Sequence, residues 1–258
     1  MSNLRLRSLG AALVIAALAV TAAGCGDDDD DGGSSEELVV SAAASLSSAF
    51  PAYADAADYN AKFSFAGSDE LAAQIRQGAT PDVYAAANTT LPDDLYEEDL
   101  VDKPVVFATN RFVLAVPSEG GDITSLEDLT QPDVEIAIGD PDVPIGIYTQ
   151  ETLGKLPESE SEAILANVAS TEPDVLGIAA KLNQGAVDAG FLYRSDVDAS
   201  NGRIKGIELP ARLEPDVAYG AAVVADAKSP DEASSFVDGL LSGEGQQALR
   251  ENGFLPPP

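Results

Sequence analysis

From Leu38 onward, short apolar runs alternate with longer amphipathic segments. Short runs of β-branched, aromatic and small residues predict buried strands, and the segments between them have the length and spacing typical of helices. Strands are expected at residues 38–42, 63–66, 83–87, 112–116, 135–138 and 189–193. Alternation of strands with helices predicts an α/β protein with mostly parallel sheet.

One helix start is clearly marked near the C-terminus. Ser229 stands in the N-cap position, Pro230 in the first helical position and Glu232 in the third. This pattern predicts a helix that ends at about Leu241, followed by a short helix over about residues 245–251.

Two extended stretches, residues 105–116 and 214–224, combine an apolar run with polar neighbours. We interpret them as crossings between two lobes, although any strand with polar ends has the same pattern. In the expected organisation the hinge lies in these two crossings, where the chain passes from one lobe to the other. It assigns residues 37–108 plus 216–258 to lobe I and residues 109–215 to lobe II.

The N-terminal segment has the layout of an export signal, because Arg5 and Arg7 precede an apolar run over residues 9–23. The run has about 15 residues, whereas a transmembrane helix needs roughly 20, so a membrane-spanning anchor is the weaker alternative. Small residues then precede Cys25, the single cysteine, as in a bacterial lipobox. We expect a signal peptide over residues 1–24 and lipidation of Cys25, which would anchor the exported protein to the outer face of the cell membrane.

A strongly acidic stretch follows the cysteine. Residues 27–31 are five consecutive aspartates, and residues 32–35 are glycine and serine. Such a self-repelling polar segment cannot pack a core, so residues 25–36 are expected to form a disordered tether. A tail without a specific role is the alternative.

Composition excludes several classes of function. The chain has no histidine, one cysteine and one methionine, which removes Ser-His-Asp triads, histidine-ligated zinc and cysteine-pair metal sites. With 14 basic and 44 acidic residues its net charge is -30, which opposes binding to nucleic acid. An enzyme would need Asp, Glu, Lys or Tyr as general base, and no pair of acids lies in a catalytic motif. We therefore expect a non-enzymatic protein without a cofactor.

Candidate chemistry lies where strands meet helices. Ser45 follows the strand at 38–42 and is placed to cap a helix over residues 46–60, and Ser68 follows the strand at 63–66 in the same way. Helix N-termini leave N–H groups unpaired and carry partial positive charge, so such junctions bind anions without Lys or Arg. Taken alone, each serine is explained as an ordinary N-cap.

Three further donors lie at similar junctions. The loop over residues 139–148 is stiffened by two prolines and presents the main-chain N–H of Ile145 before a helix that reaches about Leu156. Val175 stands at another helix start, and Tyr193 ends the strand at 189–193. A connecting turn, a helix cap and a packed tyrosine are the ordinary explanations of these features.

Together, in order and spacing, these motifs resemble the molybdate-binding proteins of bacterial ABC transporters, which belong to the periplasmic binding protein class. The resemblance covers about residues 38–254. It is carried by residues 41–46, 64–68 with Leu71-Ala72, 78–84, 139–148, 190–193 with Ser195-Asp196, and the closing segment 236–254. It implies a two-lobed, type II-like fold with a hinge, and a monomer that delivers molybdate or tungstate to a membrane permease with a cytoplasmic ATPase.

Carried over by position, the resemblance implies a defined set of oxyanion contacts. They are the hydroxyl and N–H of Ser45, the hydroxyl and N–H of Ser68, the N–H groups of Ile145 and Val175, and the hydroxyl of Tyr193. All of these groups are donors, which suits a dianion that offers acceptors alone. Molybdenum would therefore be held as its oxyanion, through the same residues.

Two positions depart from the expected pattern. Asp69 directly follows Ser68, and a carboxylate in the cavity would oppose a dianion, so Asp69 is expected to point to solvent. Pro51 lies inside the helix expected after Ser45 and should kink it or shorten its first part.

Other ligands and roles remain open at this stage. A receptor for sulfate, phosphate or an organic acid belongs to the same class of protein. Protonated phosphate needs an acceptor, so a donor-only site argues against it and an Asp side chain in the cleft would support it. A surface interaction module without a ligand would lack a cleft. The sequence does not separate molybdate from tungstate.

Overall fold

The computed structural model describes residues 37–119 and 121–258. The signal peptide, Cys25 and the acidic tether predicted for residues 1–36 lie outside the described residues. Within the described ranges, no helix has the length and apolar character that a membrane crossing requires.

The strands of the described residues form two sheets of five strands each. The first sheet has the order β2-β1-β3-β10-β4. Its strands are β1 (Leu38–Ala43), β2 (Ala61–Ala66), β3 (Val83–Ala86), β4 (Val105–Asn110) and β10 (Val217–Val223). β1 pairs in parallel with β2 and β3, whereas β10 is antiparallel to both β3 and β4.

The second sheet repeats this arrangement with the order β7-β6-β8-β5-β9. Its strands are β5 (Phe112–Pro117), β6 (Ile136–Gly139), β7 (Val168–Glu172), β8 (Ala189–Tyr193) and β9 (Ile204–Glu208). β6 pairs in parallel with β7 and β8, and β5 is antiparallel to β8 and β9. In each sheet four strands therefore share one direction, which confirms the predicted α/β class with mostly parallel sheets.

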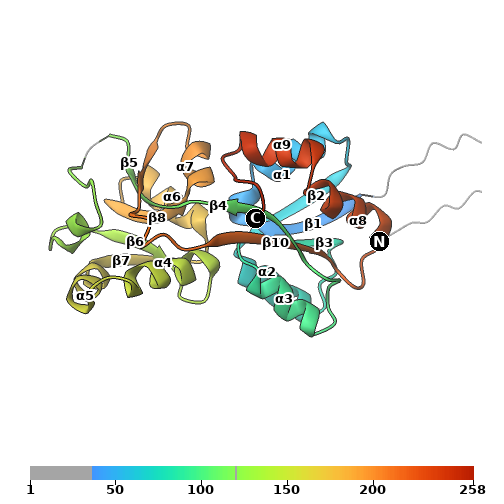
Figure 1. Ribbon diagram of the computed structural model, residues 1–258, viewed down its shortest axis with the longest axis horizontal. Coiled ribbons are helices and arrows are strands. Elements are labelled where there is room, and N and C mark those ends of the chain that lie inside the picture. Colours follow the sequence, from blue (N-terminus) through green and yellow to red (C-terminus); the bar gives the residue numbers. More distant parts are fainter. Residues whose placement is uncertain (1–36, 120) are drawn as a thin grey trace, which may run out of the picture. The chain divides into compact units, whose positions relative to one another are not determined.

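Helices cover both faces of each sheet (Figure 1). On the first sheet α2 (Ser68–Arg76) and α3 (Thr90–Glu97) lie on one face, and α1 (Ala49–Ala56), α8 (Pro230–Gly239) and α9 (Gly243–Glu251) lie on the other. On the second sheet α4 (Pro144–Gly154) and α5 (Glu158–Ala166) lie opposite α6 (Val175–Asn183) and α7 (Arg194–Ala199). Short 3-10 helices are η1 (Ala44–Leu46) and η2 (Glu127–Thr130).

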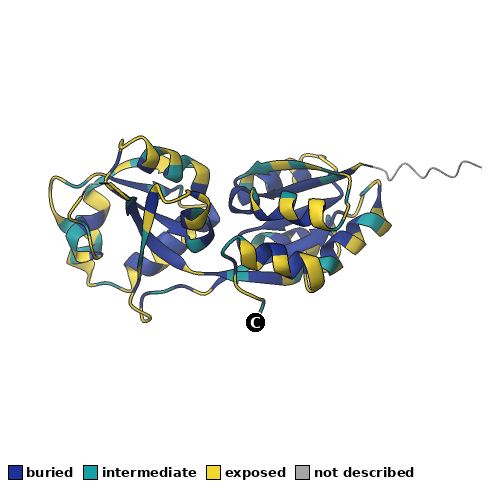
Figure 2. Ribbon diagram, turned by 90° about the horizontal axis from the view of Figure 1, so that it is seen from above, coloured by how far each residue is buried: buried dark blue, intermediate teal, exposed yellow. Residues whose placement is uncertain are grey.

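Burial on both faces explains the apolar strand sequences. In β3, Val83 and Ala85 join one core cluster, while Tyr84 and Ala86 join a second cluster under α2 and α3. This is the period of two that a strand requires when both of its faces are covered. Figure 2 shows the resulting pattern, with buried strands and helices whose outer surfaces are exposed.

The chain passes from the first sheet to the second at Arg111, between β4 and β5, and returns between β9 and β10. The pairing of β4 with β10 extends to Asn110. Thr109 and Asn110, which the prediction assigned to lobe II, therefore belong to the first sheet.

The segment after β1 differs from the helix predicted over residues 46–60. Ser45 lies in the 3-10 helix η1, and α1 begins at Ala49. Pro51 is therefore the third residue of α1, in the first turn, where its missing N–H costs no intrahelical hydrogen bond. The predicted shortening of this helix is confirmed, and its predicted start is wrong.

Candidate functional site

The carboxyl ends of the parallel strands converge on one pocket. In the first sheet β1 leads to Ser45, β2 to Ser68 and β3 to Ala87; in the second, β6, β7 and β8 lead to Ile145, Val175 and Tyr193. Parallel neighbouring strands end at the same sheet edge, which is where open α/β sheets bind ligands. The pocket is lined by residues 43–45, 66–68, 87, 143–145, 173–175 and 193.

The pocket is small. Its cavity volume is ≈ 20 Å³. A sphere of that volume has a radius of about 1.7 Å, comparable with the distance between the central atom and an oxygen atom in a tetrahedral oxyanion. Pockets for drug-sized organic molecules are about 300 Å³ or more, so this conformation suits a compact ion.

Ser68 presents its hydroxyl from the first position of α2. Its Oγ accepts a hydrogen bond from the main-chain N–H of Ala87 at 3.1 Å, and the Tyr84 hydroxyl donates to the Ser68 carbonyl at 2.7 Å. Gly67 occupies the N-cap and no side chain caps this helix, so Ser68 is not the ordinary N-cap that its sequence position suggested. Because Oγ already accepts from Ala87, the Ser68 hydroxyl hydrogen remains to be donated elsewhere.

Ser45 presents its hydroxyl from η1, where it too makes no capping bond. Its Oγ lies 3.0 Å from the hydroxyl of Tyr219 on β10, and either group can be the donor. Ser45 is buried, as is Tyr219. The hydroxyl is therefore held by a side chain from a distant part of the sequence.

Main-chain donors come from the second lobe. Ile145 is the second residue of α4 and Val175 the first residue of α6, and the N–H groups at these positions have no partner within their helices. In α6, Asp174 is the N-cap and its Oδ1 accepts from the N–H of Gly177 at 3.0 Å. That bond satisfies the third N–H of the helix and leaves the Val175 N–H at the pocket wall.

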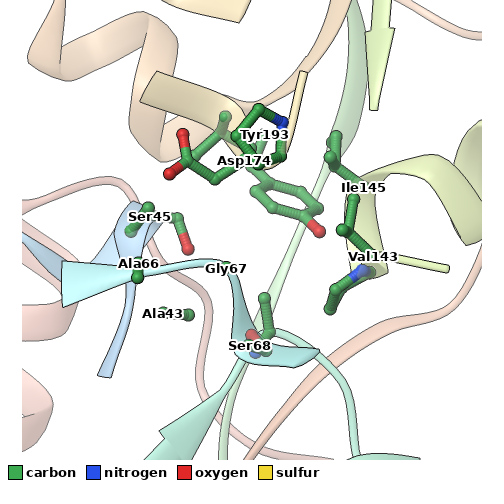
Figure 3. Close-up of a pocket in the computed structure, with 14 residues that line it drawn as sticks. Ala43, Ser45, Ala66, Gly67, Ser68, Val143, Ile145, Asp174 and Tyr193 are labelled. Carbon is green, nitrogen blue, oxygen red and sulfur yellow. The ribbon is translucent and has the colours of Figure 1, made fainter. Parts of the chain in front are cut away.

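Tyr193 completes the lining from the end of β8. Its ring packs edge-on against Tyr148, at 6.2 Å between ring centroids, and against Tyr219, at 5.8 Å. The hydroxyl is buried and has no hydrogen-bond partner among the described residues, and Figure 3 shows it directed into the space beside Ser68 and Ile145. Burial raises the pKa of Tyr193 well above its ordinary value, so the phenol stays protonated and remains a donor.

One carboxylate belongs to the lining, which corrects the expectation of a donor-only site. Asp174 lines the pocket, although it is engaged as the cap of α6. In Figure 3 its carboxylate turns away from the Tyr193 hydroxyl. Its negative charge is therefore at the pocket wall, while its acceptor atoms face away from the donors.

Asp69 does not behave as expected. Instead of pointing to solvent, its Oδ1 is buried without a hydrogen-bond partner among the described residues. A Cβ on Gly67 would lie 2.8 Å from this oxygen and 2.8 Å from the carbonyl oxygen of Pro173, so the loop before α6 closely covers this part of α2. Burial raises the pKa of Asp69 as a result. The residue does not line the pocket.

Asp196 lies next to Tyr193, on the side of the pocket that the second sheet forms. Its Oδ2 accepts from the main-chain N–H of Tyr193 at 3.0 Å. Burial raises the pKa of Asp196 to about 7; the Tyr193 N–H opposes this shift and the charge of Asp174 adds to it. This carboxyl therefore titrates near neutral pH.

The structure brings together all five predicted site residues, Ser45, Ser68, Ile145, Val175 and Tyr193, around the one pocket. Two supporting residues were not predicted: Tyr219, which contacts Ser45 from β10, and Ala87, whose N–H donates to Ser68. Ala87 could have been found, since it is the last residue of the predicted strand at 83–87 and parallel strands end together.

Comparisons with known proteins identify the family of the chain. The family model described as bacterial extracellular solute-binding protein matches residues 38–255. The molybdate-binding protein ModA of Mycobacterium tuberculosis (strain ATCC 25618 / H37Rv) is 32% identical over 200 residues, which are 77% of this chain and 74% of the relative. ModA of Haemophilus influenzae is 30% identical over 203 residues, with 74% and 77% covered.

A solved structure of a molybdate-binding protein has a similar fold. The structure of the periplasmic molybdate-binding protein of Azotobacter vinelandii superposes with a TM-score of 0.76 at 18% identity, covering 86% of this chain and 100% of that one. The family model and the relatives at 32% and 30% identity confirm the resemblance predicted from the ordered motifs, and the structural match confirms the fold.

Proposed function

The chain belongs to the bacterial extracellular solute-binding proteins, and on that premise we propose that it captures molybdate, or tungstate, for an ABC importer. Proteins of this class bind and deliver a solute and catalyse no reaction. Relatives at 30% and 32% identity are named as molybdate-binding proteins, which supports this choice of ligand.

The observation that carries the proposal is the buried hydroxyl of Tyr193, which has no hydrogen-bond partner in the described part of the chain. A buried polar group without a hydrogen bond costs about 1–3 kcal/mol and calls for an explanation. An oxyanion in the pocket would accept from this hydroxyl and from the oriented hydroxyl of Ser68. Ser45, Ile145 and Val175 would supply the remaining donors.

Neutral donors are sufficient for a tight complex. A charge-assisted hydrogen bond contributes on the order of 1.5–3 kcal/mol net, so about five to seven such bonds reach a sub-micromolar dissociation constant after the cost of association. Ligand binding therefore needs no Lys or Arg, and none lines the pocket. The small cavity favours one tetrahedral ion.

We propose that lobe I comprises residues 37–110 and 216–258 and lobe II residues 111–215, which moves the predicted boundary by two residues to the end of β4. The two chain passages between the sheets, at Arg111 and between β9 and β10, support a hinge that closes the lobes on the ligand. The closed monomer would dock on a membrane permease that is driven by a cytoplasmic ATPase.

We further propose that the protein is exported and held at the outer face of the cell membrane by a lipid on Cys25. The apolar run over residues 9–23 and the small residues before Cys25 support this assignment, and the acidic stretch after it supports a tether. Metabolic labelling with a radioactive fatty acid should mark the wild type and leave Cys25→Ala unmarked; labelling of both would contradict the anchor.

Titration calorimetry on residues 33–258 tests the ligand. Molybdate and tungstate should release or absorb heat with sub-micromolar dissociation constants, and sulfate should give no saturable signal. Saturable heat from sulfate alone would mean that the ligand is another oxyanion than molybdate or tungstate. The absence of saturable heat with all of these anions would contradict the proposed function.

Phosphate is the second candidate, because Asp174 places one acceptor-bearing side chain at the pocket wall. A protonated phosphate could donate to this carboxylate, whereas molybdate could not. Saturable heat from phosphate that disappears in Asp174→Asn would favour this candidate over molybdate. The outward turn of the carboxylate in Figure 3 favours molybdate.

A further inference from the structure

A row of buried polar side chains lies behind Ser45, outside the pocket lining. Tyr219 on β10, Asn110 at the end of β4 and Ser195 on α7 are all buried. The Tyr219 hydroxyl lies 3.0 Å from Ser45 Oγ, and Asn110 Nδ2 donates to Ser195 Oγ at 2.9 Å. The Asn110 amide also lies near the Tyr219 hydroxyl, where it lowers the pKa of Tyr219 against the larger rise that burial causes. The row thus runs from the pocket to the first chain crossing.

Its direction follows from the chemistry of the amide. Asn110 Oδ1 accepts from the main-chain N–H of Arg111 at 2.9 Å, which identifies this atom as the oxygen and leaves Nδ2 toward the other partners. An amide nitrogen can only donate, so toward Asn110 the Tyr219 oxygen can act only as an acceptor, and the Tyr219 hydrogen is left for Ser45.

A bound ligand determines which of the two hydroxyls, that of Tyr219 or that of Ser45, is the donor. A serine hydroxyl has one hydrogen, and a bound dianion takes that hydrogen because it has nothing to donate. Ser45 Oγ must then accept from Tyr219, and the hydroxyls of Tyr219 and Ser45 become two donors in series to the anion. Donors arranged in series polarise one another in a buried environment, so each strengthens the next.

We propose that Tyr219 and Asn110 are positioning residues that fix the Ser45 hydroxyl as a donor to the bound oxyanion. They act through Ser45 and do not touch the ligand. This inference rests on the proposed function, because it needs an oxyanion in the pocket. It differs from the support of Ser68, where a main-chain N–H does the same work.

A double-mutant cycle with molybdate tests the link. Tyr219→Phe keeps the ring and removes the hydroxyl, and it should weaken binding by about tenfold in calorimetry. In a Ser45→Ala background the same change should alter affinity by less than about twofold, since the group that Tyr219 orients is gone. Equal losses in both backgrounds, or no loss in the wild type, would overturn the proposal.

Tyr53→Phe is the matched control. Tyr53 is also a buried tyrosine of lobe I, and its hydroxyl donates to the carbonyl of Phe236 at 3.1 Å, away from the pocket. Its loss should lower stability and leave the dissociation constant unchanged. A change in affinity as large as that of Tyr219→Phe would show that any buried hydroxyl of this lobe has the effect.

A cycle without ligand separates this proposal from the proposed function. Urea unfolding of the ligand-free wild type, Tyr219→Phe, Asn110→Ala and the double variant measures the coupling between the two side chains directly. Members of one hydrogen-bond network give non-additive losses. Additive losses would overturn the row whatever anion binds, whereas non-additive losses with no molybdate binding would contradict the ligand alone.

Discussion

The two walls of the pocket have the same topology and different donors. Both sheets place three parallel strands, β2-β1-β3 and β7-β6-β8, with their carboxyl ends at the pocket. The wall from lobe I presents the side-chain hydroxyls of Ser45 and Ser68. The wall from lobe II presents main-chain N–H groups at two helix starts, together with the Tyr193 phenol.

This difference teaches where sequence matters in the site. The fold determines where the donors lie, but a hydroxyl disappears with one side-chain substitution, whereas a main-chain N–H survives every substitution except proline. The first wall should therefore be sensitive to side-chain truncation and the second to loss of an N–H.

The largest expected effect comes from removing both serine hydroxyls from the lobe I wall. Ser68→Ala should weaken molybdate binding by about 1–3 kcal/mol, and Ser45→Ala with Ser68→Ala should weaken it by at least about 100-fold, because two charge-assisted bonds are lost. Calorimetry measures both. Ser234→Ala, which removes an exposed hydroxyl of α8, is the control. A double variant within about threefold of the wild type would refute the role of this wall.

The main-chain donors of the lobe II wall can be tested by removing a single N–H group. Val175 is the first residue of α6 and follows Asp174 in extended conformation, so proline fits there and removes only the N–H. Val175→Pro should weaken binding by about tenfold or more, whereas Val175→Ala, which keeps the N–H, should change it by less than about twofold. Equal effects of the two variants would mean that the side chain, and not the amide, matters.

Tyr193→Phe should separate affinity from stability. The ligand-free protein should gain stability, because the change removes a buried hydroxyl that has no partner in residues 37–119 and 121–258, while molybdate affinity should fall by about tenfold. Thermal unfolding without ligand and calorimetry with it measure the two quantities. Loss of both together would show that the hydroxyl has a structural partner and no role in binding.

The smallest expected effect is a pH dependence of the second wall. Burial raises the pKa of Asp196 to about 7, so its carboxyl is neutral below that pH and charged above it. Because the folded pKa is raised, the stability that this group contributes is present at low pH and is lost as pH rises through about 7.

Molybdate affinity should fall in the same window, by about threefold between roughly pH 6 and pH 8, since the new charge lies next to Tyr193 in the wall that holds the dianion. Asp196→Asn keeps an acceptor for the Tyr193 N–H and should flatten the dependence. An unchanged slope in this variant would assign the effect to another group.

Much of this fold could be predicted because its central strands are buried on both faces. β3, β5 and β8 read as continuous apolar runs and were predicted within one residue of their observed ends. The edge strands β7 and β9 were missed, since their side chains are mostly half-buried or exposed and their sequences carry no apolar run. β4 and β10 were expected as extended crossings, which is close to what they are.

The site was predictable as far as it depends on strand ends. Ser45, Ser68, Ile145, Val175 and Tyr193 come together because parallel strands end at one edge. The support of Ser45 was not predictable, because Tyr219 is 174 residues away and reaches it through antiparallel pairing of β10. Asp69 was placed wrongly for a similar reason: the loop that covers it comes from the other lobe.

The central claim is that neutral hydroxyls and main-chain amides from two lobes hold a dianion in a protein of net charge -30. A crystal structure of the molybdate complex, with diffraction data on both sides of the molybdenum absorption edge, tests it most directly. The account predicts one anomalous peak enclosed by Ser45, Ser68, Ile145, Val175 and Tyr193, with oxygen atoms at hydrogen-bond distance from each. A peak elsewhere, or one in contact with carboxylates instead of these donors, would contradict it.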